Sequence, residues 1–226
     1  MKIGILQTGH APAEVLGTLG DYPDMFARLL SGRGLDFETW AVVDNDFPPG
    51  ADAADGWLVT GSKHGAYEDH PWIPPLEELL RAIAASSRPM IGICFGHQII
   101  AQALGGRVEK FSGGWAIGPQ AYDFDGTALT LNAWHQDQVV EKPAAAQTIA
   151  TNPFCRHAGL AYGDSILTVQ PHPEFGADMV AALIRHRGPG LIDDAQLAQA
   201  EARLDTALDA PAFANRMADF FKRTRS

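Results

Sequence analysis

The stretch that decides the fold is Met90-Ile91-Gly92-Ile93-Cys94-Phe95-Gly96-His97-Gln98, where an apolar strand runs through a cysteine into a helix. A cysteine at a sharp strand-to-helix turn needs small neighbours, because the backbone of such an elbow is strained and crowded. Gly92 and Gly96 meet that need. The dipole and free amides of the following helix favour a thiolate and can bind an oxyanion. Taken alone, the pattern also fits a structural cysteine in a Gly-rich turn.

Strands and helices alternate on both sides of this stretch, which favours a parallel sheet with helices on both faces. Apolar runs and helical spacing predict strands at 2–8, 37–43, 57–60 and 90–93, and helices at 22–30, 76–85 and 99–104. Further strands are expected at 107–111, 115–124, 128–131, 148–151, 160–162 and 166–169, and closing helices at 179–186, 195–208 and 212–221. We therefore expect an α/β fold with an open, mostly parallel sheet and an antiparallel edge layer. It forms one domain over 1–226, with its core in 1–187 and a helical extension over 190–226.

Length and charge narrow the class of protein. The chain has 226 residues, of which 46% are apolar and 19% charged, a globular balance for one or two domains. The net charge of −10 comes without a basic run, so neither nucleic acid nor an anionic membrane is an expected partner. No apolar run reaches the ~18 residues of a membrane-spanning helix. The two cysteines make no disulfide framework, and we expect a cytoplasmic protein.

A base for the thiol is predicted in Gln170-Pro171-His172-Pro173-Glu174, which follows the expected strand at 166–169. The two prolines hold the chain extended, so that residues two apart point to the same side. Glu174 can then accept a hydrogen bond from one ring nitrogen of His172 and leave the other nitrogen for Cys94. Alone, this motif also fits a turn with an exposed carboxylate, but the elbow and the motif together favour a catalytic arrangement.

These motifs, in this order, resemble the class I (triad-type) glutamine amidotransferases from the first strand to about residue 187. In particular they resemble a stand-alone, GMP-synthase-like subgroup to which plant γ-glutamyl peptidases are similar. The resemblance implies an open, flavodoxin-like sheet and hydrolysis of a γ-glutamyl amide without metal or organic cofactor. It also implies a role for each of six residues: Cys94 as nucleophile, His172 as base and acid, Glu174 as its orienter, the Gly61 and Phe95 amides as oxyanion hole, and Gln98 in glutamine binding.

Two more segments are expected at the substrate pocket. In the family's arrangement, Trp134-His135-Gln136-Asp137 lies where the glutamine-positioning strand should lie, so His135, Gln136 and Asp137 are predicted to bind the γ-glutamyl group. Ser112-Gly113-Gly114-Trp115 only partly matches a nucleotide-binding loop and is expected to shape the pocket rim, with Trp115 as a wall. Gly61-Ser62-Lys63-His64 departs from the Gly-Gly-Pro loop of many amidotransferases, which leaves the loop shape and the substrate choice open.

The loop from Lys63 to His70 contains metal-ligand residue types, but their spacing matches no known site, so we expect a solvated loop at the pocket mouth. Cys155 lacks a neighbouring base and is expected to be a bystander. Three functions stay open. The chain releases ammonia from glutamine for a separate synthetase subunit, or it is a free-standing γ-glutamyl peptidase, or it is a non-catalytic binding module. The intact Cys94, His172 and Glu174 argue against the third, and a redox or chaperone role would not need the His172 motif.

Overall fold

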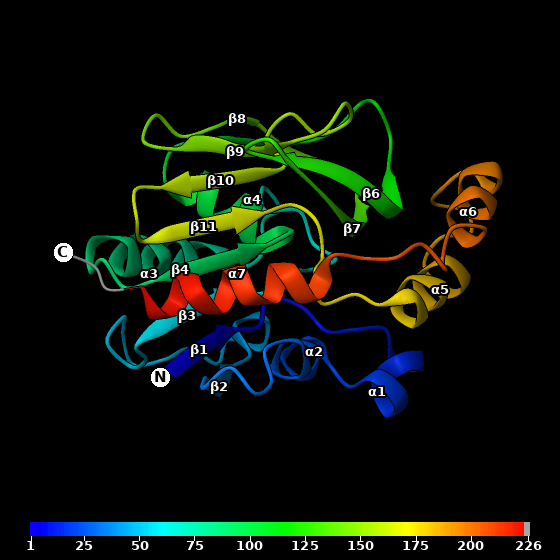
Figure 1. Ribbon diagram of the computed structural model, residues 1–226. Helices are drawn as coiled ribbons and strands as arrows, with labels where there is room; N and C mark the ends of the chain where they lie inside the picture. Colours follow the sequence, from blue (N-terminus) through cyan, green and yellow to red (C-terminus); the bar gives the residue numbers. More distant parts are fainter. Residues whose placement is uncertain (224–226) are drawn as a thin grey trace.

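A nine-stranded mixed sheet runs through the computed structural model, which describes residues 1–223 (Figure 1). The strand order is β2-β1-β3-β4-β11-β10-β9-β6-β7, and the first five strands are parallel while the last four pair antiparallel. A separate antiparallel pair joins β5 to β8. The strands are β1 Lys2–Leu6, β2 Asp36–Trp40, β3 Gly56–Val59, β4 Met90–Ile93, β5 Arg107–Lys110, β6 Ala116–Phe124, β7 Thr127–His135, β8 Asp137–Glu141, β9 Gln147–Thr151, β10 Gly159–Tyr162 and β11 Ile166–Val169.

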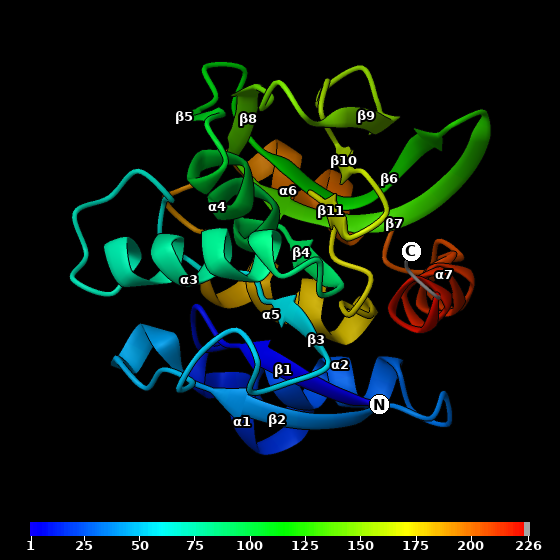
Figure 2. The same ribbon diagram turned by 90° about the vertical axis from the view of Figure 1, so that its left-hand side faces the viewer.

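Helices cover both faces of the sheet. Figure 2 shows α3 and α4 on one side and α7 on the other, and α1, α5 and α6 lie beyond the carboxyl ends of the parallel strands (Figure 1). The helices are α1 Ala13–Leu19, α2 Tyr22–Leu29, α3 Ile73–Ala85, α4 Phe95–Ala103, α5 Ala177–His186, α6 Asp194–Glu201 and α7 Ala210–Lys222, with a 3-10 turn η1 at Val42–Asp44. The predicted class of fold is thereby confirmed.

The core forms on both faces because successive strand residues point to opposite sides. On β3, Trp57 and Val59 pack with α3 and α4, whereas Leu58 packs with α2 and α7. All three side chains are fully buried. A continuous apolar strand of this kind is typical of parallel sheets that are covered on both faces.

The carboxyl ends of three neighbouring strands are aligned. Val59 of β3 pairs with Gly92 of β4, and Ile93 pairs with Val169 of β11. The segments that follow these strands therefore leave the sheet side by side. They carry Gly61, Cys94 and His172, which are far apart in the sequence.

Most element predictions agree with the structure, and the differences have local causes. The predicted strands at 2–8 and 37–43 end early, at Leu6 and Trp40, and the second gives way to η1. The helix expected at 76–85 begins at Ile73, since Pro74 and Pro75 fit its first turn, and the helix expected at 99–104 begins directly after Cys94. The helix expected at 195–208 ends at Glu201. The strand expected at 128–131 extends to His135, whereas α1 and β8 were not predicted.

Candidate active site

Cys94 occupies a strained turn between β4 and α4. Its φ of 53° and ψ of −104° are unusual for a residue with a side chain, and it is the N-cap of α4. A Cβ added to Gly92 would lie 2.6 Å from the Gly96 carbonyl oxygen, and one on Gly96 would lie 2.3 Å from that of Val59. Both glycines are therefore required by close backbone contacts, as the sequence pattern predicted.

His172 lies beside Cys94 and is held from three sides. Its Nδ1 lies 2.7 Å from Oε1 of Glu174, and its ring stacks on Phe175 at 3.9 Å between centroids with an interplanar angle of 5°. Its backbone N–H donates to the Asn132 carbonyl of β7 at 2.8 Å. The Glu174 side chain is fully buried, and its Oε2 has no hydrogen-bond partner among residues 1–223. One ring nitrogen is thus committed to Glu174, which leaves the other for the thiol.

The electrostatics of His172 favour the protonated ring. Burial would lower the pKa of His172, but the charges of Cys94 and Glu174 and the hydrogen bonds to both raise it to about 10. The hydrogen bond between the side chains of Cys94 and His172 is one of these contributions. An imidazolium held between two anions can stabilise a thiolate and later donate a proton.

Backbone amides lie next to the side chains of Cys94 and His172. A Cβ on Gly61 would stand 2.9 Å from Cε1 of His172 and 3.8 Å from Cβ of Cys94, so the Gly61 backbone passes directly against both side chains. Phe95 is the first residue of α4, where backbone N–H groups have no partner within the helix. The N–H of the next residue, Gly96, donates to the Thr60 carbonyl at 3.0 Å and ties the helix start to the Gly61 segment.

A cavity of about 490 Å³ opens in front of Cys94. Of the ten predicted site residues, seven line it: Cys94, Gln98, Trp115, His135, Gln136, Asp137 and His172. Glu174, Gly61 and Phe95 lie behind that surface, and their contacts connect them to Cys94 or His172. The structure therefore brings all ten into one region, and their individual roles stay predictions.

The segment from His135 to Asp137 is held rigidly against α4. Gln98 donates through Nε2 to the Asp137 carbonyl at 2.8 Å and to Oε1 of Gln170 at 3.1 Å. Nε2 of buried His135 has no hydrogen-bond partner within the described residues. Burial lowers the pKa of His135 to about 3, so its ring is neutral. Burial also raises the pKa of the Asp137 carboxyl, which accepts a hydrogen bond from Tyr67.

Sequence reasoning missed several residues that surround the site. Tyr22 and Phe175 line the cavity, and their rings lie 6.0 Å apart. Burial and the nearby charge of Glu174 raise the pKa of Tyr22, so it is a neutral hydroxyl. Tyr22 opens a helix 72 residues before Cys94 in the chain. Only Phe175 could have been found, because it directly follows the His172 motif.

Two charged residues at the cavity, Lys110 and Arg187, were also missed. With Lys63 they are three cationic side chains that line the cavity together with two carboxylates, Glu68 and Asp137. Asp137 was predicted as a site residue, and Lys63 and Glu68 belong to the loop that was expected at the pocket mouth. Lys110 and Arg187 lie at the ends of elements that carry no motif, so no pattern in the sequence could assign them. The balance favours an anionic ligand.

Known proteins with similar sequences and folds include enzymes acting on glutamine and γ-glutamyl groups. The family model for "Glutamine amidotransferase class-I" matches residues 26–181. Gamma-glutamyl peptidase 4 of Arabidopsis thaliana is 31% identical over 183 residues, covering 74% of this chain and 73% of that protein. A glutamine-hydrolyzing GMP synthase subunit of Saccharolobus solfataricus is 38% identical over 100 residues, covering 38% of this chain and 50% of that protein. A glutamine amidotransferase structure from Thermotoga maritima superposes with a TM-score of 0.76 at 20% identity and covers 99% of both chains.

None of the helices within residues 1–223 has both the length and the apolar character needed to cross a membrane.

Proposed function

Because this chain belongs to the class I glutamine amidotransferase family, we propose that it hydrolyses γ-glutamyl amides through a thioester on Cys94. The observation that carries the proposal is the contact of Cys94 with a His172 ring that is itself hydrogen-bonded to buried Glu174. A nucleophile, a base and an orienting carboxylate in this sequence of contacts are the requirements of covalent acyl transfer.

The first half of the reaction forms the thioester. The Cys94 thiolate attacks the γ-carbonyl carbon, and the carbonyl oxygen becomes an oxyanion that accepts hydrogen bonds from the Phe95 and Gly61 amides. One such donor contributes about 3–4 kcal/mol to the transition state. The His172 imidazolium then gives its proton to the leaving nitrogen as the C–N bond breaks. An amine departs, and the γ-glutamyl group remains on sulfur.

The second half releases glutamate. Neutral His172 takes a proton from a water molecule, whose oxygen attacks the thioester carbon. The same amides hold the second oxyanion. The C–S bond breaks, the Cys94 thiolate returns, and the new carboxylic acid loses its proton to solvent. Throughout, Glu174 accepts the hydrogen bond from Nδ1 and keeps the ring in the working orientation.

The γ-glutamyl group would lie against the segment from His135 to Asp137. The Asp137 carboxylate suits the substrate's α-amino group, while Gln136 offers a further polar contact. Gln98 acts through the Asp137 carbonyl that it holds, and Trp115 forms an apolar wall. The arrangement supplies a few polar groups in a partly apolar cavity, as small-molecule sites do.

The cavity supports a leaving group larger than ammonia. Its volume of about 490 Å³ falls within the ~300–1,000 Å³ of pockets for drug-sized ligands, which exceed glutamine in size. The cations Lys63, Lys110 and Arg187 suit a carboxylate on the departing half. We therefore favour a γ-glutamyl peptidase, which agrees with the similarity to the Arabidopsis gamma-glutamyl peptidases.

A second candidate is a glutaminase that passes ammonia to a separate synthetase subunit. The similarity to the GMP synthase subunit of Saccharolobus solfataricus favours it. The two candidates share the chemistry at Cys94 and differ only in the leaving amine.

The test is release of glutamate by the purified chain from glutamine and from a panel of γ-glutamyl amides, including dipeptides with a free or an amidated carboxyl terminus. We expect release from the dipeptides, faster with the free carboxylate, and none from the Cys94→Ala variant. Cys155→Ala serves as the matched cysteine control and should keep activity.

The results of this test distinguish the peptidase from the glutaminase subunit. Absence of release from every substrate, with Cys94 still alkylated by a glutamine-like affinity label, would point to a glutaminase subunit that needs its synthetase. Full activity in Cys94→Ala would show that the nucleophile is wrongly assigned.

A further inference from the structure

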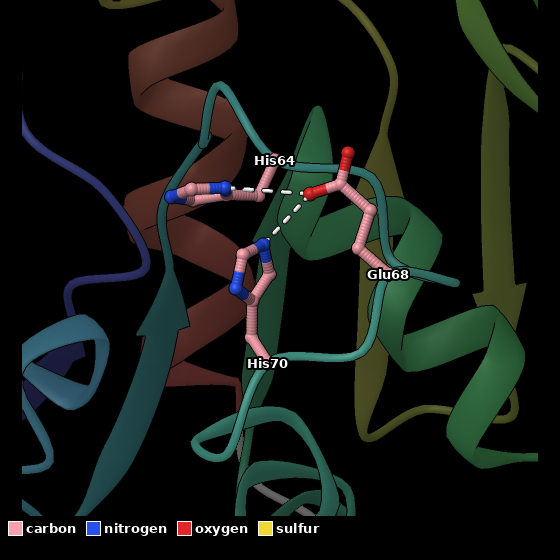
Figure 3. Close-up of side chains that lie close together, drawn as sticks. All are labelled: His64, Glu68 and His70. Carbon is pink, nitrogen blue, oxygen red and sulfur yellow. Dashed lines mark hydrogen bonds and ion pairs between the residues drawn. The ribbon is translucent and has the colours of Figure 1, made fainter.

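The loop between β3 and α3 gathers three potential metal ligands at the wall of the Cys94 cavity. In Figure 3, His64 and His70 each turn a ring nitrogen toward the same carboxylate oxygen of Glu68. Nε2 of His70 lies 2.8 Å and Nδ1 of His64 lies 3.4 Å from Oε2 of Glu68. All three ligand atoms lie within 4.8 Å of one another. The spacing along the chain matches no metal motif, so only the folded loop reveals this cluster.

We propose that Nδ1 of His64, Oε2 of Glu68 and Nε2 of His70 together bind one Zn²⁺ ion. Two imidazoles and one carboxylate are a donor set that zinc accepts, with a fourth position left for water or another ligand. His64 and Glu68 line the cavity that also contains Cys94. The ion would therefore sit at the cavity wall, outside the proposed catalytic group.

The distances suit one shared ion. With zinc–ligand distances of about 2.0–2.1 Å in a tetrahedral site, neighbouring ligand atoms stand about 3.3 Å apart. The separations of Oε2 of Glu68 from the two ring nitrogens, 2.8 and 3.4 Å, lie on either side of that value. These two separations would have to change by only about 0.1–0.5 Å, and the two ring nitrogens, which lie within 4.8 Å of each other, would be drawn onto the same ion.

The rings are already held in place. Trp72 is buried, its ring stacks on His70 at 5.8 Å and 11°, and it meets the edge of His64 at 5.8 Å. Trp72 in turn packs on Phe95 at 5.6 Å. The loop backbone is tied to α4 by Nε2 of Gln102, which donates to the Ala66 carbonyl at 2.7 Å. A site on a loop supported in this way loses less conformational entropy when an ion binds.

The experiment is a titration of the chelator-treated full chain with ZnCl₂ in a calorimeter. We expect one ion per chain, bound much more weakly by His70→Ala and by Glu68→Gln. Loss of a group that only orients a ligand costs about 10–100-fold in metal affinity, so loss of a ligand should cost at least that. His186→Ala, a histidine at the same cavity outside the cluster, should leave the zinc affinity unchanged.

A second variant excludes the other zinc site that this cavity offers, the thiol and imidazole of Cys94 and His172. Cys94→Ala removes the proposed catalytic activity but should retain zinc binding, so failure of the proposed function does not affect this test. If Cys94→Ala abolishes binding while Glu68→Gln does not, the ion sits on the catalytic pair and the proposal is wrong. Absence of zinc binding in the unmodified chain would also overturn it.

Binding of Co²⁺ gives an independent readout of the ligand set. Tetrahedral Co²⁺ absorbs visible light more strongly than octahedral Co²⁺, so the unmodified chain should show an intense visible band. Glu68→Gln, which is close in shape to the native residue and keeps the loop folded, should weaken that band. An unchanged spectrum in this variant would exclude Glu68 as a ligand.

Discussion

At the scale of single residues, the proposed catalytic group is positioned by contacts that do not involve substrate. Phe175 stacks on His172, and the carboxylate of Glu174 fixes the orientation of the ring. The sequence could predict His172 and Glu174 as a pair, and it places Phe175 directly after them, but it could not show that the Phe175 ring stacks on His172. The pairing follows from chain geometry over three residues, whereas stacking depends on how the following turn folds.

Replacing Glu174 by Gln should lower kcat by about 10²–10⁴-fold, the range over which general acid–base groups act. The amide keeps the shape of the side chain but presents a donor or a weaker acceptor to Nδ1 of His172. The imidazole ring is then no longer held in the tautomer and orientation that proton transfer requires. Steady-state rates of glutamate release measure the effect. Asp178→Asn, an exposed change four residues on, is the matched control. Equal rates in both variants would remove Glu174 from the mechanism.

Two buried histidines predict how stability depends on pH. Burial lowers the pKa of His97 and of His135 to about 3, against about 6.5 in the unfolded chain. The unfolded state therefore takes up protons first, and stability falls as pH drops from about 6.5 toward 3. Each histidine contributes a slope of up to about 1.4 kcal/mol per pH unit.

His172 has the opposite sign, because its folded pKa of about 10 lies above the unfolded value. Its contribution is complete below about 6.5 and is lost as pH rises toward 10, so stability should be greatest near pH 6.5. Urea unfolding at a series of pH values measures the profile. His97→Gln should remove about half of the slope due to the two buried histidines between pH 5 and 6. An unchanged acid slope in that variant would contradict the assignment.

At the scale of elements, the turn between β4 and α4 depends on two glycines that a side chain cannot replace. Gly92→Ala places a Cβ 2.6 Å from a backbone oxygen and should lower the free energy of unfolding by about 1–3 kcal/mol. Gly17→Ala on exposed α1 meets nothing within 4 Å and should raise it by about 0.5–1 kcal/mol. Urea unfolding midpoints test whether stability falls in Gly92→Ala and rises in Gly17→Ala. If both variants are less stable, the close contact at Gly92 is not the cause of the loss.

The sequence predicted those elements whose buried residues form an apolar run or recur at a regular spacing. The strand at Ile166–Val169 was predicted with its observed bounds, since all four residues are buried. The helix α1 was not predicted, because only Val15 of its seven residues is buried and Gly17 interrupts it. β8 was missed for a related reason: it pairs only with the short β5, away from the main sheet.

At the scale of the whole molecule, the C-terminal helix belongs to the central core. Phe213 of α7 is fully buried in one cluster with Ile3 of β1 and Leu58 of β3, and its ring lies 5.5 Å from Phe124 of β6. The sequence indicated a helical extension there but not which surface it covers, because that depends on how the chain returns after α6. The last three residues of the predicted extension, 224–226, lie outside the described residues.

Phe213→Ala should therefore lower the free energy of unfolding by about 3–5 kcal/mol, as expected for a large ring deleted from a core. Leu16→Ala, a matched change on exposed α1, should alter it by less than about 0.5 kcal/mol. Thermal and urea unfolding of both variants give the comparison. A small effect at Phe213 would mean that α7 detaches without disturbing the sheet.

Because β3, β4 and β11 are aligned, the proposed bond-breaking chemistry and much of the cavity wall depend on different parts of the chain. The proposed chemistry depends on turns fixed to the sheet, at Gly61, Cys94 and His172. Much of the cavity wall beyond them comes from other segments, such as those at Lys110 and Arg187. We expect exchange of those segments between homologues to alter which amine the proposed reaction releases, while the proposed bond-breaking step stays intact. Under the proposed function, grafting of these segments alone should therefore change the leaving group that the site accepts.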